Sequence, residues 1–182
     1  DLEFSPVVAE HCPVLREAIA HVGHRQTRNR GTIGGSLCHL DPSAELVNIA
    51  ALLGATFHAA SKRGKRDIAF AEFAAAYMTT CLAADELLAG VTLPLPKRNC
   101  GYAFVEFARR HGDFAIVACA VLMELGRDGN IANVSIALSG LGHVPVRPAP
   151  IEKALLRQRP DAATFKAVAE GGNSITLSYD YA

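Results

Sequence analysis

An excess of charge of either sign and long apolar runs are both missing from this sequence of 182 residues. Its 18 basic side chains balance 18 acidic ones, so we expect no long-range field that would attract nucleic acid or an anionic membrane. No run of about 18 apolar residues occurs, and no membrane span is predicted. Hydrophobic residues still make up 50% of the chain, enough for one core or for two small cores that share an interface.

Cysteine pairs with metal-ligand spacing are absent as well. The sequence has five cysteines but no Cys-x-x-Cys pair, so no zinc or iron–sulfur ligand run is predicted. The odd number, with no basic-then-apolar signal peptide, leads us to expect free thiols in a reducing compartment. His21 and His24 are three residues apart, but no third ligand accompanies them, and we interpret both as surface residues.

Common nucleotide-binding and hydrolase motifs are also missing. No Gly-Lys-Ser/Thr follows the glycines of residues 31–35, which excludes a P-loop. The dinucleotide pattern Gly-x-Gly-x-x-Gly, with an acidic residue at the usual offset, is not found. Without a Gly-x-Ser-x-Gly sequence or a convincing order of Ser, His and Asp, no nucleophile is predicted.

Hydrophobic periodicity predicts a mixture of helices and strands. Helical spacing indicates helices over residues 13–22, 42–53, 70–77, 151–157 and 162–169. Apolar alternation and turn residues indicate strands over residues 55–59, 66–69, 87–93, 102–107, 117–125 and 132–138. The last ten residues give no clear prediction.

The order of these elements favours an α+β fold in two parts. The prolines of residues 94–99 interrupt regular structure twice, and we place a domain boundary there. After it, consecutive strands followed by helices predict a three-stranded antiparallel sheet with helices packed on one face. Alternation in the last strand turns Asn133, Ser135 and Ser139 toward one side, which predicts a solvated face.

Residues 27–36 form the most informative segment and are predicted to be irregular. Glycines at 31, 34 and 35 can adopt positive φ and let backbone N–H groups approach a ligand closely. Exposed N–H groups near a helix start bind anions such as a pyrophosphate. We expect that helix to begin with Asp41 as its cap and Pro42 in its first position. From spacing alone, a phosphate cradle and a plain tight turn both stay open.

A longer string around these glycines resembles a known motif. Residues 28–45, RNRGTIGGSLCHLDPSAE, are similar to the second flavin-binding motif of the FAD-binding (medium) subunits of molybdenum hydroxylases, the xanthine dehydrogenase and carbon monoxide dehydrogenase family. Residues 101–115 resemble the opening of the C-terminal domain of the same subunits. The resemblance implies the second subdomain of a PCMH-type FAD-binding domain at residues 1–96 and the C-terminal domain at residues 97–182.

The resemblance also implies which residues contact FAD. They are Thr32, Ile33, Gly34, Gly35, Ser36, His39, Asp41, Leu88 and Asp113. Residues 32–36 would bind mainly through backbone N–H groups, Leu88 would form an apolar wall, and Asp113 would approach the flavin ring. Asp41 would be both helix cap and hydrogen-bond acceptor. Each also has a structural alternative: Asp41 as a cap alone, His39 as a surface residue, Leu88 as core and Asp113 as a turn cap.

The implied function is electron transfer within an oxidoreductase complex. A molybdopterin subunit would hydroxylate the substrate, and an iron–sulfur subunit would carry electrons through [2Fe–2S] clusters to FAD. NAD, a quinone or another acceptor would then take them. We expect a cytoplasmic complex, with peripheral association at the inner face of the membrane as an alternative.

The sequence departs from the family pattern in two ways. No Ala-Gly-Gly motif of the first flavin-binding subdomain is found, so we expect the chain to carry the second subdomain only. Glu106 stands where many relatives have lysine, and its carboxylate is expected to disfavour a reduced, anionic flavin. The alternatives are a flavin-free assembly module or truncated fragment that docks the other subunits, and an unrelated nucleotide-phosphate binder.

Overall fold

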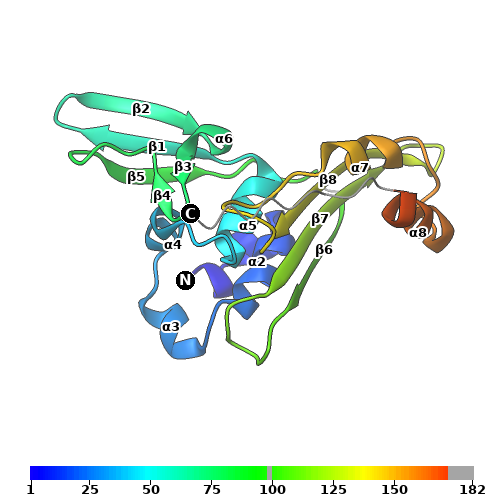
Figure 1. The fold of residues 1–182 in the computed structure, drawn as a ribbon, viewed down its shortest axis with the longest axis horizontal. Helices are drawn as coiled ribbons and strands as arrows, with labels where there is room; N and C mark the ends of the chain where they lie inside the picture. The colour runs from blue at the N-terminus through cyan, green and yellow to red at the C-terminus, as the bar shows by residue number, and fades with distance from the viewer. Residues whose placement is uncertain (98–99, 172–182) are drawn as a thin grey trace.

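The computed structural model describes residues 1–97 and 100–171 (Figure 1). Its helices are η1 (Leu2–Phe4, a 3-10 helix), α1 (Pro6–His11), α2 (Pro13–His21), α3 (Arg25–Arg30), α4 (Ile33–His39), α5 (Glu45–Leu53), α6 (Phe70–Phe73), α7 (Ala149–Leu155) and α8 (Ala162–Gly171). Its strands are β1 (Thr56–Ser61), β2 (Gly64–Ala69), β3 (Ala74–Ala76), β4 (Thr79–Thr80), β5 (Leu87–Thr92), β6 (Cys100–Phe107), β7 (Val117–Leu125) and β8 (Ile131–Ser139). The last ten residues of the chain lie outside this description.

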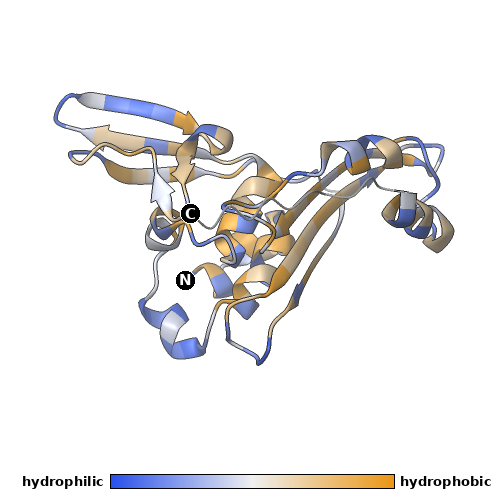
Figure 2. Ribbon diagram, viewed as in Figure 1, coloured by the Kyte–Doolittle hydropathy of each residue, from blue (hydrophilic) through white to orange (hydrophobic). Residues whose placement is uncertain are grey.

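The first sheet has the strand order β2-β1-β5, with both pairs antiparallel. Phe57, Ala59 and Ile68 are buried on one face, whereas β2 is otherwise exposed and hydrophilic (Figure 2). Phe57 stacks on Phe73 with ring centroids 3.9 Å apart. Leu37 of α4 belongs to the same buried cluster, so the first sheet is the support on which α4 rests.

The second sheet is antiparallel with the order β6-β7-β8, which confirms the predicted three-stranded sheet. Ile136 of β8 packs with Leu155 of α7 on one face. On the other face, α5 packs against β7 and β8 and α2 packs against β6, and Ala118 and Ala120 of β7 belong to the buried cluster between them. Figure 1 shows α2 and α5 on the opposite side of this sheet from α7. Helices therefore cover both faces, because the N-terminal half supplies the second layer.

Two local predictions are wrong. The predicted solvated face of the last strand is lost at Ser139, which is fully buried because α5 covers it and Asn48 Nδ2 donates to its Oγ at 2.6 Å. The predicted helix over residues 70–77 ends after one turn at Phe73, since the next residues form β3 and pair with β4. Among the described residues, no helix is both long and apolar enough to cross a bilayer.

Candidate cofactor site

The segment predicted to be irregular, residues 27–36, is largely helical. Helix α3 ends at Arg30, and α4 begins at Ile33 after a two-residue extended break. Thr32 is the N-cap of α4, and its Oγ1 accepts from the N–H of Gly35 at 3.0 Å. Hydroxyl capping of this kind stabilises a helix start, and burial of Leu37 anchors the helix. The anion-binding feature of this segment is therefore a helix start and not a loop.

The three glycines of this segment do not use positive φ, contrary to the expectation from sequence. A Cβ on Gly31 would lie 3.1 Å from the carbonyl oxygen of Thr27, and one on Gly35 would lie 2.9 Å from Thr32 Oγ1. Local packing thus accounts for these two glycines. A Cβ on Gly34 would meet nothing within 4 Å, so its backbone is left open to an incoming ligand.

Two backbone donors are unused at the start of α4. The N–H groups of Ile33 and Gly34 find no acceptor within residues 1–97 and 100–171. The first N–H groups of a helix have no partner inside the helix, and the helix dipole places partial positive charge there. An anion with several oxygens, such as a pyrophosphate, fits this chemistry.

A cavity of about 850 Å³ lies beside this helix start. Five of the nine predicted cofactor-binding residues line it: Thr32, Ile33, Gly35, Ser36 and His39. Residues 1–4, the end of α2 and the last turn of α3 form the rest of its wall. Its size lies within the range of about 300 to 1,000 Å³ that is usual for small-molecule sites.

Two arginines of α3 beside the cavity have different surroundings. Arg28 Nε donates to Glu3 Oε2 at 3.0 Å, and its Nη1 donates to the carbonyl oxygens of Val22 and Gly23. The hydrogen bond from Arg28 lowers the pKa of Glu3. Arg28 is thus committed to holding α3 against the end of α2. Arg30 also lines the cavity but has no ion-pair partner in the described part of the chain.

Asp41 is not a helix cap, and that prediction is wrong. Helix α5 begins at Glu45 with Ala44 as an N-cap that makes no side-chain hydrogen bond. Asp41 Oδ1 instead accepts from the N–H of Ser43 at 2.8 Å, which is a local turn. Leu40, with a φ of 55°, ends α4 just before it. Pro42 accordingly lies in the turn and not in a first helical position, and Asp41 lies outside the cavity wall.

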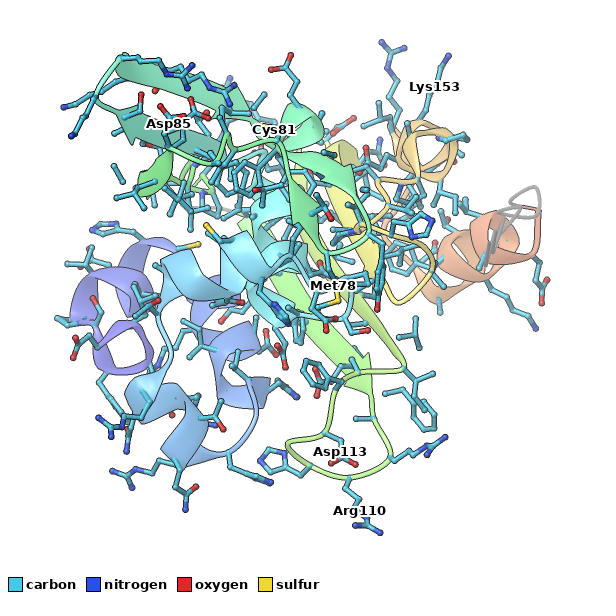
Figure 3. The ribbon with its side chains drawn as sticks, turned by 60° about the vertical axis from the view of Figure 1, so that its left-hand side comes forward. Met78, Cys81, Asp85, Arg110, Asp113 and Lys153 are labelled. Atoms are coloured by element: carbon cyan, nitrogen blue, oxygen red, sulfur yellow. The ribbon has the colours of Figure 1, made fainter. Side chains whose placement is uncertain are left out.

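Leu88 and Asp113 are not brought to the cavity either. Leu88 lies on β5 and, like Ile33, packs against the buried cluster that supports α4. Asp113 lies in the β6–β7 loop, where a Cβ on Gly112 would be 2.5 Å from the His24 ring. Figure 3 shows Asp113 near the tip of this loop, away from α4. The roles of both residues toward FAD stay predictions.

Sequence reasoning missed a buried polar cluster between α5 and the second sheet. Glu45 is 7% exposed, and burial, with Glu106 and Asp41 nearby, raises its pKa to about 7. The Glu106 side chain is 6% exposed, and its Oε1 lies 3.2 Å from His21 Nδ1. Asn48 is fully buried. A signal was available, because Glu45 and Asn48 are the two polar residues of a segment that is otherwise apolar on every side, and a helix that is apolar all round is usually buried.

Comparison with known proteins places this arrangement in a family. Residues 1–96 match the family described as FAD binding domain in molybdopterin dehydrogenase. The chain belongs to this family. Residues 102–175 match a second family, the CO dehydrogenase flavoprotein C-terminal domain. The matches confirm the expected family, the fold class and FAD as the cofactor of this type of domain.

Relatives of known activity are similar over most of the chain. The 6-hydroxypseudooxynicotine dehydrogenase complex subunit alpha of Paenarthrobacter nicotinovorans is 37% identical over 155 residues, 85% of this chain and 52% of the relative. Quinoline 2-oxidoreductase from Pseudomonas putida 86 superposes with a TM-score of 0.86 at 35% identity, over 92% of this chain and 58% of that one. Carbon monoxide dehydrogenase from Hydrogenophaga pseudoflava superposes with a TM-score of 0.87 at 30% identity, over 93% and 59%. The chain spans about half the length of the curated relatives it matches.

Proposed function

We propose that this chain holds the pyrophosphate of FAD at the start of α4 and acts as an electron-transferring flavin module of a molybdenum hydroxylase complex. The observation that supports this most directly is the pair of unused N–H donors of Ile33 and Gly34 at the start of α4, beside a cavity of about 850 Å³ that Ile33 and Gly35 line, although Gly34 itself is not part of its wall. When bound, FAD supplies the redox chemistry, and the protein supplies position and electrostatics.

The residues around α4 fit such a ligand. Ile33 and Gly34 offer backbone donors, and the Ser36 side chain lies on the cavity wall. Arg30 offers a positive charge that no acidic residue of the described chain neutralises. A hydrogen bond contributes about 0.5 to 1.5 kcal/mol net and more when one partner is charged, so a few such contacts give measurable affinity.

The partners and acceptor belong to the same proposal. An iron–sulfur subunit and a molybdopterin subunit would donate electrons, and NAD, a quinone or another acceptor would receive them. The names of the relatives support assembly, since they describe a subunit alpha of a dehydrogenase complex and a medium chain of carbon monoxide dehydrogenase.

A second function, docking other subunits without flavin, is favoured by one observation. Large apolar side chains are exposed at one end of the second sheet: Val105 at 64%, Phe107 at 63%, Phe114 at 70% and Ile116 at 49%. Exposed apolar residues gathered in one region are typical of interaction surfaces. A docking function without flavin predicts that the chain binds no FAD. A test for FAD binding therefore distinguishes the two proposed functions.

That experiment is the visible absorption spectrum of the purified chain, alone and after addition of FAD and desalting. Retained flavin absorbance supports the proposal, and Gly34→Asp should then abolish it. An aspartate in the first turn suits the helix dipole and meets no neighbour, so the fold should persist while the phosphates are repelled. Gly171→Asp, at the end of α8, is the control for added charge and should retain FAD. A colourless wild-type chain would contradict FAD binding by this chain alone.

A further inference from the structure

A polar cluster lies inside the packing of α2 and α5 against the second sheet. Around it, Val14, Ile49 and Phe104 form part of one buried apolar cluster. Within this apolar seam lie Glu45 and Asn48 of α5, His21 of α2, Glu106 of β6 and Ser139 of β8. The polar cluster thus lies where α2 and α5, from the first matched family at residues 1–96, contact strands of the second, at residues 102–175.

The hydrogen bonds of this cluster are incomplete. Asn48 Nδ2 donates to Ser139 Oγ at 2.6 Å, and His21 Nδ1 lies 3.2 Å from Glu106 Oε1. Asn48 Oδ1 and Glu106 Oε2 are buried and have no partner among the described residues. Both atoms are acceptors, so each calls for a donor. Leaving a buried polar atom unpaired is unfavourable, by about 1 to 3 kcal/mol.

The charges of the cluster do not balance either. Glu106 and Asp41 are the charged groups that act on Glu45, and both are acidic. His21 is the basic side chain that contacts Glu106. At the other end of α5, Arg147 donates to the carbonyl oxygens of Ala51 and Leu52 and forms an ion pair with Glu152. Arg147 therefore makes its contacts away from Glu45. A buried carboxylate without a cation nearby usually retains its proton.

We propose that Glu45, buried with Glu106 in this part of the packing and without a cation of its own, retains its proton at neutral pH, so that the packing of α5 against the second sheet responds to pH. A proton on Glu45 adds one donor to a cluster with two unpaired acceptors and removes a buried negative charge. This inference concerns the fold of the chain and does not depend on FAD.

The direction of the effect follows from Glu45. Burial raises its pKa from 4.5 to about 7, and repulsion by Glu106 and Asp41 acts in the same direction. The folded state therefore holds a proton that the unfolded chain releases. The resulting stability is complete below about pH 4.5 and is lost as the pH rises through about 7.

Two measurements on the 182-residue chain test the proposal. If the folded chain retains one proton, the equilibrium constant for unfolding in urea should rise about tenfold per pH unit. This rise is expected between the ordinary Glu45 pKa of 4.5 and the folded-state value of about 7. Glu45→Gln should lose this one-proton component, whereas the exposed Glu17→Gln on α2 should keep it. Equal pH dependence in the wild type and Glu45→Gln would overturn the proposal.

Carbon-13 titration of the glutamate carboxyls covers the case in which Glu45→Gln does not fold. The Glu45 carboxyl of the wild type should titrate with a midpoint near 7, and Glu106→Gln should lower that midpoint by removing the repulsion. A wild-type midpoint at the ordinary value of 4.5, or one that Glu106→Gln leaves unchanged, would overturn the proposal.

Discussion

Helices α4 and α5 follow one another in the chain, but the first turn of α5 contains an acidic residue and the first turn of α4 does not. The first turn of α4 contains Gly34 and Gly35, has no acidic residue and faces a cavity. The first turn of α5 carries the carboxyl of Glu45, which is buried against the second sheet. A helix start attracts anions in either case. At α4 this position is free for an external anion, whereas at α5 it is occupied by the chain's own Glu45 carboxyl, which burial keeps from being a full negative charge.

The two helices also differ in how firmly they are held. Leu37 is the one buried residue of α4, whereas α5 buries Glu45, Val47, Asn48, Ile49, Ala50, Ala51 and Leu52. Regions with few buried contacts open locally at a lower free energy. A binding helix with one fully buried side chain can adjust to its ligand, while α5 serves as the layer that links the two sheets.

The largest expected effect comes from removing the anchor of each helix. Leu37→Ala and Leu52→Ala delete side chains that are 1% and 2% exposed, and each should reduce the free energy of unfolding by about 2 to 5 kcal/mol. Urea unfolding measures this loss. Hydrogen exchange should then distinguish the two variants, because Leu37→Ala should increase the exchange of the α4 amides selectively. Leu37→Ala should also weaken FAD retention. If both variants lose FAD equally, the difference in anchoring does not matter for binding.

A smaller effect distinguishes the two glycines in the first turn of α4. Gly34→Ala meets open space and should stabilise the helix by up to about 1 kcal/mol. Gly35→Ala brings a methyl group to 2.9 Å from Thr32 Oγ1 and should disturb the cap, at a cost of about 0.5 to 2 kcal/mol. Thermal unfolding should rank Gly34→Ala above Gly35→Ala.

FAD affinity should not follow that ranking. If the pyrophosphate binds to the Gly34 N–H, the methyl group of Gly34→Ala should hinder its approach, and loss of one hydrogen bond weakens binding about 2- to 10-fold. A Gly34→Ala variant that is more stable and binds FAD as tightly as the wild type would place the pyrophosphate elsewhere.

The sequence was sufficient to predict the family and the elements around α4 and α5, but not the contrast between the two helix starts. Apolar periodicity predicted α2 and the strands of the second sheet, because their patterns are long and regular. The string at residues 28–45 identified the family. Helix α4 as a whole was missed because two adjacent glycines lower helix propensity, and the tertiary contacts of Leu37 and the cap by Thr32 compensate for it.

The errors at α5 have a different cause. Asp41 and Pro42 form a pattern typical of a helix start, yet their turn closes locally through Ser43. Which polar residues are buried depends on the pairing of α5 with the second sheet, across contacts distant in sequence such as Asn48 with Ser139. Periodicity along one element carries no information on that partner, so the cluster around Glu45 required the structure.

The smallest expected effect concerns the unpaired charge beside α4. Arg30→Gln should weaken FAD binding about 2- to 5-fold, since an exposed charge contributes up to about 1 kcal/mol, and the difference should shrink at high salt. Arg28→Gln should instead lower the stability of the fold, because Arg28 holds Glu3 and the end of α2. Lys62→Gln, on the β1–β2 turn, is the control for loss of a positive charge away from the cavity. Titration with FAD at two salt concentrations measures all three. If Lys62→Gln weakens binding as much as Arg30→Gln, the effect belongs to net charge and not to the start of α4.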